Sequence, residues 1–317
     1  MIDKFSATKT YRICAVVVTF NRKVLLGECL RALLKQTRPL DQVIVVDNAS
    51  TDGTEDMMRR SFPDITYVKL AENTGGAGGF HEGMKLAYEK GHDWMWVMDD
   101  DAAPTADALE KLTSCSIIHQ DMVYALASAV LNRDGTIYLA TRRLFDTETL
   151  VETVISADKY EQDYFQMDTG SFVGLLINRR VIDQVGLPNK DFFIYYDDTE
   201  YSLRIRNLGI MVTVPASKIT HGEYRNASDK SIGRNDSWDW WKYYYIRNRI
   251  YTFRRHGDVG LIFYVNQIII MLWESRIVLL WHHSRFKAMS IILCGTLDGL
   301  MGKLGKNNRF LPNEPGC

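Results

Sequence analysis

The first hundred residues alternate apolar, β-branched runs with segments of helical periodicity, and this alternation constrains the fold more than any other feature. Apolar runs at residues 13–18, 43–46, 65–70 and 94–98 predict buried strands. Apolar side chains recur at helical spacing between these runs, for example over residues 24–36. Strands that alternate with helices in this way predict a mostly parallel, doubly wound, Rossmann-like α/β sheet. Its ligands are expected beyond the carboxyl ends of the strands.

Three consecutive carboxylates, Asp99, Asp100 and Asp101, directly follow the fourth apolar run. Adjacent carboxylates repel one another unless a cation or solvent screens them. Oxygen ligands at the end of a strand suit Mg²⁺ or Mn²⁺. The triplet therefore indicates a cation site, with a solvated acidic turn as the alternative.

Four glycines within residues 75–79 predict a loop before a helix over residues 79–90. Glycine allows a close backbone approach to a ligand, and the exposed amides of such a loop can face an anion. The run does not match the dinucleotide-binding fingerprint GxGxxG, because His81 takes the place of the last glycine. The segment is thus either a ligand-binding loop or only a turn.

A second acidic cluster, Asp197, Asp198 and Glu200, follows the aromatic segment 192–196. Partial burial would raise the pKa of such a carboxyl group and make it a plausible general base. The same residues could also simply cap a helix start. Further along, His221 is expected beyond a strand at 210–214 and a turn at Pro215, either as a metal ligand or as a structural histidine.

Composition excludes several other functions. The chain has 38 Lys and Arg against 39 Asp and Glu, and this net charge of −1 gives no general attraction to nucleic acid. Five scattered cysteines without a CxxC pair argue against a disulfide framework and a zinc site, and fit a reducing cytosol. The first ten residues carry no apolar run, so we expect no secretory leader and a cytoplasmic location.

The order of these motifs resembles that of family 2 glycosyltransferases with a GT-A fold. Residues 16–22 are similar to the opening strand and loop of the family, residues 45–53 to its nucleotide-base loop, and residues 99–101 to its metal motif. The resemblance covers about residues 11 to 225. Within the family, residues 73–80 and 96–101 look most like bacterial galactofuranosyltransferases, and rhamnosyltransferases share much of this frame.

The resemblance implies a role for each candidate residue. The nucleotide-sugar pocket would be lined by Thr19, Asn21, Arg22, Asp47, Asn73, Gly76, Gly79 and Asp100. The divalent cation, Mn²⁺ or Mg²⁺, would be held by Asp99, Asp101 and His221. Asp198 would be the catalytic base, while Asp197 and Glu200 would help to place the acceptor.

The resemblance also implies an inverting, metal-dependent transferase. It would move galactofuranose from UDP-galactofuranose onto a hydroxyl of a lipid-linked or polymeric cell-surface glycan, such as a polyprenyl-diphosphate-linked acceptor. One alternative is a dTDP-rhamnose-dependent rhamnosyltransferase, and another is a non-catalytic module that binds sugar nucleotides or glycans. A glycoside hydrolase would instead need a carboxyl acid/base pair and water as the acceptor.

The chain is expected to divide into a catalytic domain, residues 1–235, and an aromatic-rich helical region, residues 236–317. The apolar stretch 261–281 is long enough to span a membrane, but burying Glu274 and Arg276 in lipid would be costly. We therefore interpret these helices as lying at the membrane interface, on the cytoplasmic face of an inner membrane. Packing on the catalytic domain, or contact in a homo-oligomer, is the alternative.

Overall fold

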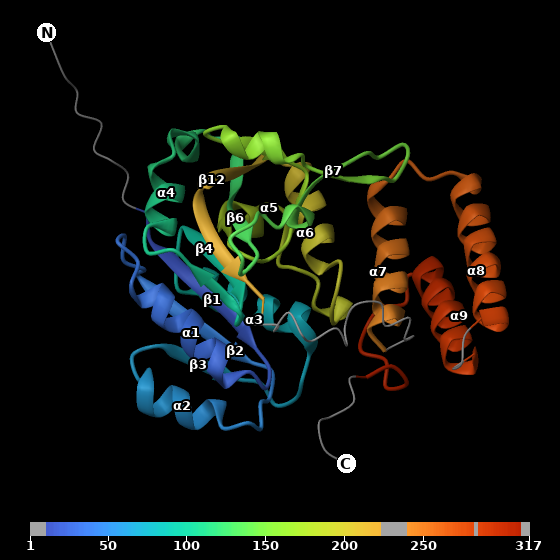
Figure 1. Cartoon of the computed structure of the whole chain (residues 1–317), viewed down its shortest axis with the longest axis horizontal. Helices are drawn as coiled ribbons and strands as arrows, with labels where there is room; N and C mark the ends of the chain where they lie inside the picture. The colour runs from blue at the N-terminus through green and yellow to red at the C-terminus, as the bar shows by residue number, and fades with distance from the viewer. Residues whose placement is uncertain (1–10, 223–239, 282–284, 312–317) are drawn as a thin grey trace, which may run out of the picture.

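A nine-stranded sheet forms the middle layer of the computed structural model, which describes residues 11–222, 240–281 and 285–311 (Figure 1). Its strand order is β3-β2-β1-β4-β11-β6-β12-β5, and β9 pairs with β12. The parallel half predicted from the sequence consists of β1 (Ile13–Thr19), β2 (Gln42–Asp47), β3 (Thr66–Lys69) and β4 (Trp94–Asp99). The mixed half consists of β5 (Ala102–Pro104), β6 (Val123–Leu131), β9 (Phe165–Met167), β11 (Leu175–Asn178) and β12 (Ile210–His221).

Helices cover both faces of this sheet, as a doubly wound fold requires. One face packs against α1 (Lys23–Leu34), α2 (Thr54–Ser61) and α4 (Ala108–Ser114). The other face packs against α3 (Gly75–Glu89), α5 (Arg180–Val185) and α6 (Asp197–Arg206). Every residue of β1 is buried, because alternate side chains enter the cores on the two faces.

Two elements differ from the sequence prediction. The glycine run is the first turn of α3 rather than a loop before it, since the helix begins at Gly75. Pro215 does not end a strand: β12 continues to His221, and Pro215 falls where the pairing with β6 shifts register between Val214 and Lys218. A proline costs little there, because no ladder hydrogen bond is interrupted.

Shorter elements fill the middle of the chain, as its irregular pattern predicts. A small antiparallel sheet is formed by β7 (Arg142–Phe145), β8 (Glu152–Val154) and β10 (Thr169–Gly170). Single 3-10 turns lie at η1 (Ser116–His119), η2 (Leu139–Thr141), η3 (Ala157–Glu161) and η4 (Lys190–Phe192). The turn η4 leads into the segment before α6, which carries the second acidic cluster.

Three helices follow the sheet and stand beside it: α7 (Trp240–His256), α8 (Leu261–Trp281) and α9 (Arg285–Met301) (Figure 1). Helix α9 packs against both α7 and α8. Ile250 and Phe253 of α7 share a hydrophobic core with Phe192 and Tyr196, which precede α6. Helix α7 is thus packed onto the segment before α6; the domain boundary predicted near residue 235 lies outside the described residues.

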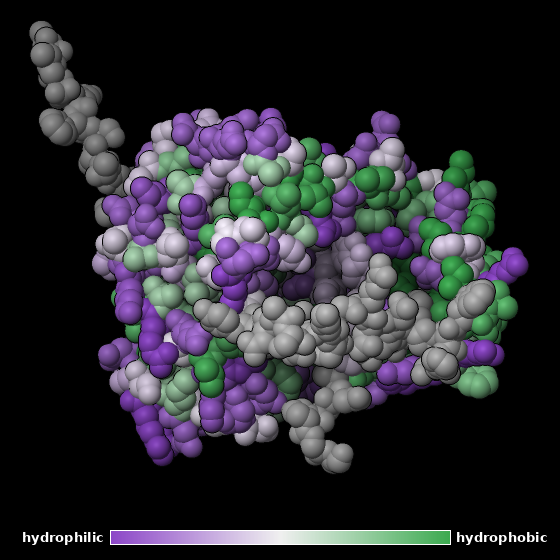
Figure 2. Space-filling model, viewed as in Figure 1, coloured by the Kyte–Doolittle hydropathy of each residue, from purple (hydrophilic) through white to green (hydrophobic). Residues whose placement is uncertain are grey.

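Helix α8 exposes an unusually large apolar surface. Within the described residues, Leu261–Leu280 is long and apolar enough to cross a membrane, with a mean hydropathy of 1.4, yet only 17% of that stretch is buried. Leu272 and Trp273 are both more than half exposed. Figure 2 shows hydrophobic side chains gathered at the end of the molecule that α8 and α9 form.

Candidate functional site

The acidic triplet meets a histidine that lies more than a hundred residues further along the chain. Strand β5 begins just after the triplet and pairs with the end of β12, so that His221 lies opposite Ala102. His221 Nε2 is 3.1 Å from Asp101 Oδ1 and 3.8 Å from Asp99 Oδ2. The structure thus brings together the three residues predicted as metal ligands, with ligand atoms within 4.8 Å of one another.

The charges in this cluster are interdependent. Burial alone would lower the pKa of His221, but the carboxylates of Asp101 and Asp99 raise it to about 10. Burial alone would raise the pKa of Asp101, yet His221 and Arg22 lower it below its usual range. The cluster therefore stabilises positive charge beside these two carboxylates.

The donor set fits a divalent cation. Two carboxylates and an imidazole are ligands that Mn²⁺ accepts, and carboxylate oxygens are also ligands for Mg²⁺. Asp101 Oδ1 is buried, lies 3.1 Å from His221 Nε2, and accepts no regular hydrogen bond from the described residues. A buried carboxylate oxygen in that state has coordination capacity to spare.

Asp100 points to the opposite side of the triplet, toward the end of β1. Its Oδ2 accepts a hydrogen bond from Thr19 Oγ1 at 2.7 Å, and its Oδ1 lies 3.5 Å from Arg22 Nη1. Burial raises the pKa of Asp100 to about 7, although Thr19 and Arg22 oppose the shift. Arg22 also lies 3.4 Å from Asp101 Oδ2 and is 45% exposed, so its guanidinium stands at the solvent-facing rim of the cluster.

The loops after β1 and β2 are joined to each other. Asn21 Oδ1 accepts a hydrogen bond from Thr51 N, and Asn21 N donates to Ser50 Oγ, both at 2.8 Å. Asp47 is fully buried and accepts hydrogen bonds from Ser50 N and from the Tyr67 hydroxyl. The predicted nucleotide residues Asn21 and Asp47 thus fix the shape of one continuous loop surface.

Gly76 and Gly79, near the start of α3, have different roles. A Cβ added at Gly76 would meet nothing within 4 Å, whereas one at Gly79 would lie 2.5 Å from Val18 Cγ1. Gly76 therefore leaves open space near the site, and Gly79 lets the helix pack closely on β1. Asn73 Oδ1 accepts a hydrogen bond from Gly75 N at 2.8 Å and so fixes the start of the helix.

Asn48 belongs to the same corner, although no sequence motif singles it out. Its buried amide accepts hydrogen bonds from Thr74 N and Oγ1, and donates to the Gly75 carbonyl at 3.1 Å. It thereby ties the loop after β2 to the first turn of α3. A single asparagine in a polar turn carries no pattern that would reveal this contact.

Asp197 and Asp198 are the first two residues of α6, whose N-cap is Tyr196 and has no side-chain capping hydrogen bond. Asp197 is buried and Asp198 is half-buried. Burial, together with the neighbouring Asp198, raises the pKa of Asp197 well above its usual range. Burial also raises the pKa of Asp198 to about 6, with further contributions from Glu152 and Asp99.

Glu200 faces away from this pair. Its Oε2 accepts from Arg204 Nε at 3.0 Å, and its Oε1 lies 3.2 Å from His256 Nε2. Glu200 thus links α6 to α7. Glu152 of β8, which the sequence did not single out, accepts a hydrogen bond from the Tyr196 hydroxyl at 3.0 Å.

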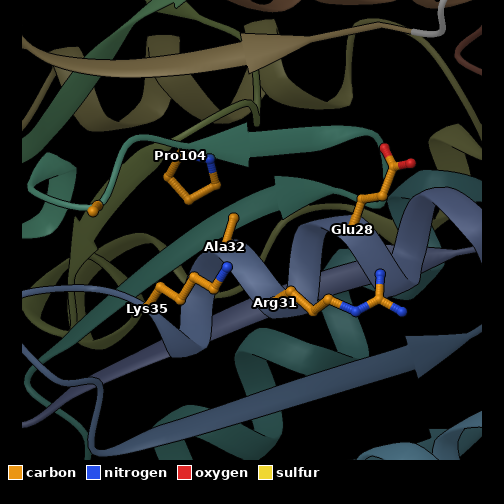
Figure 3. Close-up of a pocket in the computed structure, with 6 residues that line it drawn as sticks. Glu28, Arg31, Ala32, Lys35 and Pro104 are labelled. Atoms are coloured by element: carbon orange, nitrogen blue, oxygen red, sulfur yellow. The ribbon is translucent and has the colours of Figure 1, made fainter.

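Figure 3 shows an open cavity elsewhere on the molecule, between α1 and β5. It is lined by Glu28, Arg31, Ala32, Lys35, Pro104 and Ala106. None of the predicted site residues lines it, and the acidic cluster remains the site that the motifs indicate.

Known proteins are similar to this chain in sequence. The family model described as glycosyl transferase family 2 matches residues 14–185. Galactofuranosyltransferase GlfT1 of Mycolicibacterium smegmatis is 32% identical over 206 residues, which are 64% of this chain and 68% of the relative. The dTDP-rhamnosyl transferase RfbF of Shigella flexneri is 25% identical over 300 residues, which are 92% of this chain and 97% of the relative.

Solved structures share the fold. GalNAc-T7 with UDP, GalNAc and Mn²⁺ superposes with a TM-score of 0.58 at 14% identity, covering 93% of this chain and 56% of that chain. Mannosyltransferase PcManGT of Pyrobaculum calidifontis, in complex with GDP-Man and Mn²⁺, gives 0.55 at 17% identity, covering 93% and 89%. Fold and relatives together define a hexosyltransferase with the GT-A architecture. The chain belongs to glycosyl transferase family 2, as its motifs predicted.

Proposed function

We propose that this enzyme transfers galactofuranose, with inversion, from UDP-galactofuranose to a hydroxyl group of a lipid-linked or polymeric cell-surface glycan. The observation that carries the proposal is the convergence of Asp99, Asp101 and His221 at the end of β4, with a second acidic pair at the start of α6. The name of the Mycolicibacterium relative, a galactofuranosyltransferase, supports this donor.

Asp99, Asp101 and His221 would hold Mn²⁺ or Mg²⁺, and Asp100 would face the ribose or the donor sugar. The bound cation would supply positive charge next to the departing diphosphate. Arg22, at the rim of the cluster, would stabilise the same developing charge.

The nucleotide-sugar donor would lie along the ends of β1 and β2, against Asn21 and Arg22, with the buried Thr19 and Asp47 supporting this surface from behind. Asp47 would shape the loop surface that lies beside the base. The start of α3 would face the diphosphate or the sugar, with Asn73 fixing its first turn and Gly76 leaving room for the ligand. Gly79 would contribute by the close packing of α3 on β1.

Asp198 would act as the general base. As the acceptor hydroxyl oxygen bonds to the anomeric carbon, the bond from that carbon to UDP breaks on the opposite face, and the hydroxyl proton moves to Asp198. The raised pKa of Asp198 suits this task, because the group is ionised near neutral pH but still basic enough to take the proton. Asp197, beside the base, would help to place the acceptor, and Glu200 would support the pair by anchoring α6.

A dTDP-rhamnosyltransferase is the second candidate. The relative from Shigella flexneri aligns with nearly the whole chain, including the C-terminal helices, and its name specifies dTDP-rhamnose chemistry. A non-catalytic binding module is less well supported. Two adjacent carboxyl groups with raised pKa values repel each other, and binding alone does not require such a pair.

A transfer assay with an Asp198→Asn variant tests the proposal. Purified protein is incubated with Mn²⁺ and either UDP-galactofuranose or dTDP-rhamnose, together with a glycan acceptor, and the anomeric configuration of the product is read by NMR. Wild type should give an inverted galactofuranoside, and the variant should lose about 10²- to 10⁴-fold in turnover. A retained configuration, or equal turnover by the variant, would remove Asp198 from this role.

The exposed apolar surface of α8 would place the enzyme peripherally on the cytoplasmic face of the inner membrane. Apolar residues surround most of this helix and few of them are buried, which leaves a large apolar surface for contact with lipid. A polyprenyl-diphosphate-linked acceptor would then reach the site from the lipid. The alternative occupant of this surface is another subunit in a homo-oligomer.

A further inference from the structure

The segment before the second acidic pair has a strained backbone. Phe193, Tyr195 and Tyr196 have φ values of 67°, 64° and 65°, in the left-handed region that non-glycine residues rarely adopt. Tyr196 directly precedes Asp197, so this conformation sets the direction in which α6 begins. Such backbone geometry persists only where surrounding contacts hold it in place.

Two fully buried side chains of α7 supply those contacts. Asn248 Nδ2 lies 3.0, 2.9 and 2.8 Å from the carbonyl oxygens of Phe192, Ile194 and Tyr195. Arg247 Nη2 donates to the Phe192 carbonyl at 2.9 Å, and Arg247 Nε donates to Asn248 Oδ1 at 2.8 Å. The pair thus binds backbone carbonyls that no regular element of the segment satisfies.

The same segment also touches the donor side of the site. The Phe193 carbonyl accepts a hydrogen bond from Ala77 N in the first turn of α3 at 3.1 Å. A Cβ at Gly75 would lie 1.9 Å from that carbonyl oxygen, so the segment and the helix are in close contact. Arg247 Nη1 further binds the Gly305 carbonyl, which joins the chain after α9 to the same point.

We propose that Arg247 and Asn248 are positioning residues for sugar transfer: by holding the carbonyls of residues 191, 192, 194 and 195, they fix the start of α6, with Asp197 and Asp198, relative to the first turn of α3. The proposal rests on the proposed function of Asp198. Among the described residues, the hydrogen bonds of both side chains run to this segment, to each other and to Gly305, so each acts through the segment and touches no reacting atom. Through these two residues, helix α7 contributes to catalysis in addition to any surface that the C-terminal helices provide.

The test compares Asn248→Ala and the milder Asn248→Ser with a matched control, Tyr243→Phe. The control removes a hydrogen bond from α7 to Asp298 of α9, keeps the ring that lies against the Arg247 guanidinium, and leaves the contacts of Asn248 in place. Four quantities are measured for each protein: turnover in the transfer assay, UDP affinity with Mn²⁺ by calorimetry, the thermal unfolding midpoint, and amide hydrogen exchange over residues 192–200.

We expect Asn248→Ala to lower turnover by about 10²-fold, because small displacements of a catalytic group cost that much. UDP affinity should stay close to that of wild type, and exchange over residues 192–200 should become faster. Asn248→Ser should give a turnover and an exchange rate between those of wild type and Asn248→Ala, since the serine hydroxyl can still donate one hydrogen bond. Tyr243→Phe should lower the unfolding midpoint without changing turnover or exchange in this segment.

Three results would overturn the proposal. The first is a folded Asn248→Ala protein with wild-type turnover and exchange, and the second is an equal loss of turnover in Tyr243→Phe. The third is failure of both Asn248 variants to fold, which would make the pair a requirement of the whole fold. If wild type itself transfers no sugar, the proposed function fails; the exchange measurement then decides alone whether the pair holds the segment.

Discussion

At the scale of single residues, the central feature is a pair of adjacent carboxyl groups at the start of α6. Burial raises the pKa of both Asp197 and Asp198, and the charge of Asp198 raises the pKa of Asp197 further. Of these two groups of one chemical type, the proposed mechanism assigns the role of base to Asp198.

This difference predicts the pH dependence of transfer. The pKa of Asp198 is raised to about 6, and the base works only when ionised, so turnover should rise as the pH increases through about 6 and then level off. Asp197→Asn should keep this acidic limb in place, because the group that titrates there is Asp198. Turnover is measured from pH 5 to 8 with saturating donor and Mn²⁺. A flat profile for wild type would contradict the assignment.

The site residues that belong to recognisable motifs could be predicted from the sequence. Asp99, Asp101 and His221 were expected together, and they lie together. Asn48 and Glu152 could not be predicted, because their significance comes from contacts with segments far away along the chain. The Arg247–Asn248 pair could not be predicted for the same reason, although the many aromatic residues around it are evident in the sequence.

At the scale of elements, the register between β5 and β12 decides whether a site forms. His221 lies opposite Ala102, and a shift of one residue would turn its imidazole to the other face of the sheet. Periodicity predicted the strands of the parallel half because each is a continuous apolar run. It could not predict that β12 continues past Pro215, because that depends on an irregularity in the pairing with β6.

The glycines of α3 make a matched pair for testing helix packing. Gly79→Ala should destabilise the protein by about 1–3 kcal/mol, because its Cβ would press against Val18 on β1. Gly76→Ala should leave the free energy of unfolding nearly unchanged, since its Cβ would enter open space. Both values come from urea unfolding. Equal destabilisation by the two changes would show that α3 does not pack as described.

At the scale of the whole molecule, the C-terminal helices combine a packed side with an exposed one. Helix α7 contributes to a core shared with the segment before α6, whereas most of the apolar surface of α8 faces outward. Composition predicted helices here, but hydropathy alone could not separate a span from an interfacial or packed helix. The exposed Leu272 and Trp273 now locate the surface in question.

That surface predicts membrane binding. Leu272→Gln combined with Trp273→Gln should lower the partition coefficient into anionic lipid vesicles, measured by co-sedimentation, by about 30- to 150-fold, because it removes roughly 2–3 kcal/mol of apolar burial. Leu34→Gln, on α1, is the control, as it replaces an equally exposed leucine on another part of the molecule. If the double variant binds vesicles normally but sediments as a smaller species, the surface joins subunits instead.

The most direct test of the account is a calorimetric titration of UDP, and separately of dTDP, into the purified protein with Mn²⁺ and then with EDTA. We predict that UDP binds more tightly than dTDP, that EDTA weakens binding, and that His221→Ala weakens it by at least about tenfold. His119→Ala, a change at a histidine paired with Tyr11, should have no effect. Preference for dTDP would move the donor to a rhamnose nucleotide. Binding of neither nucleotide, or binding indifferent to EDTA and to His221→Ala, would contradict the metal-dependent donor site.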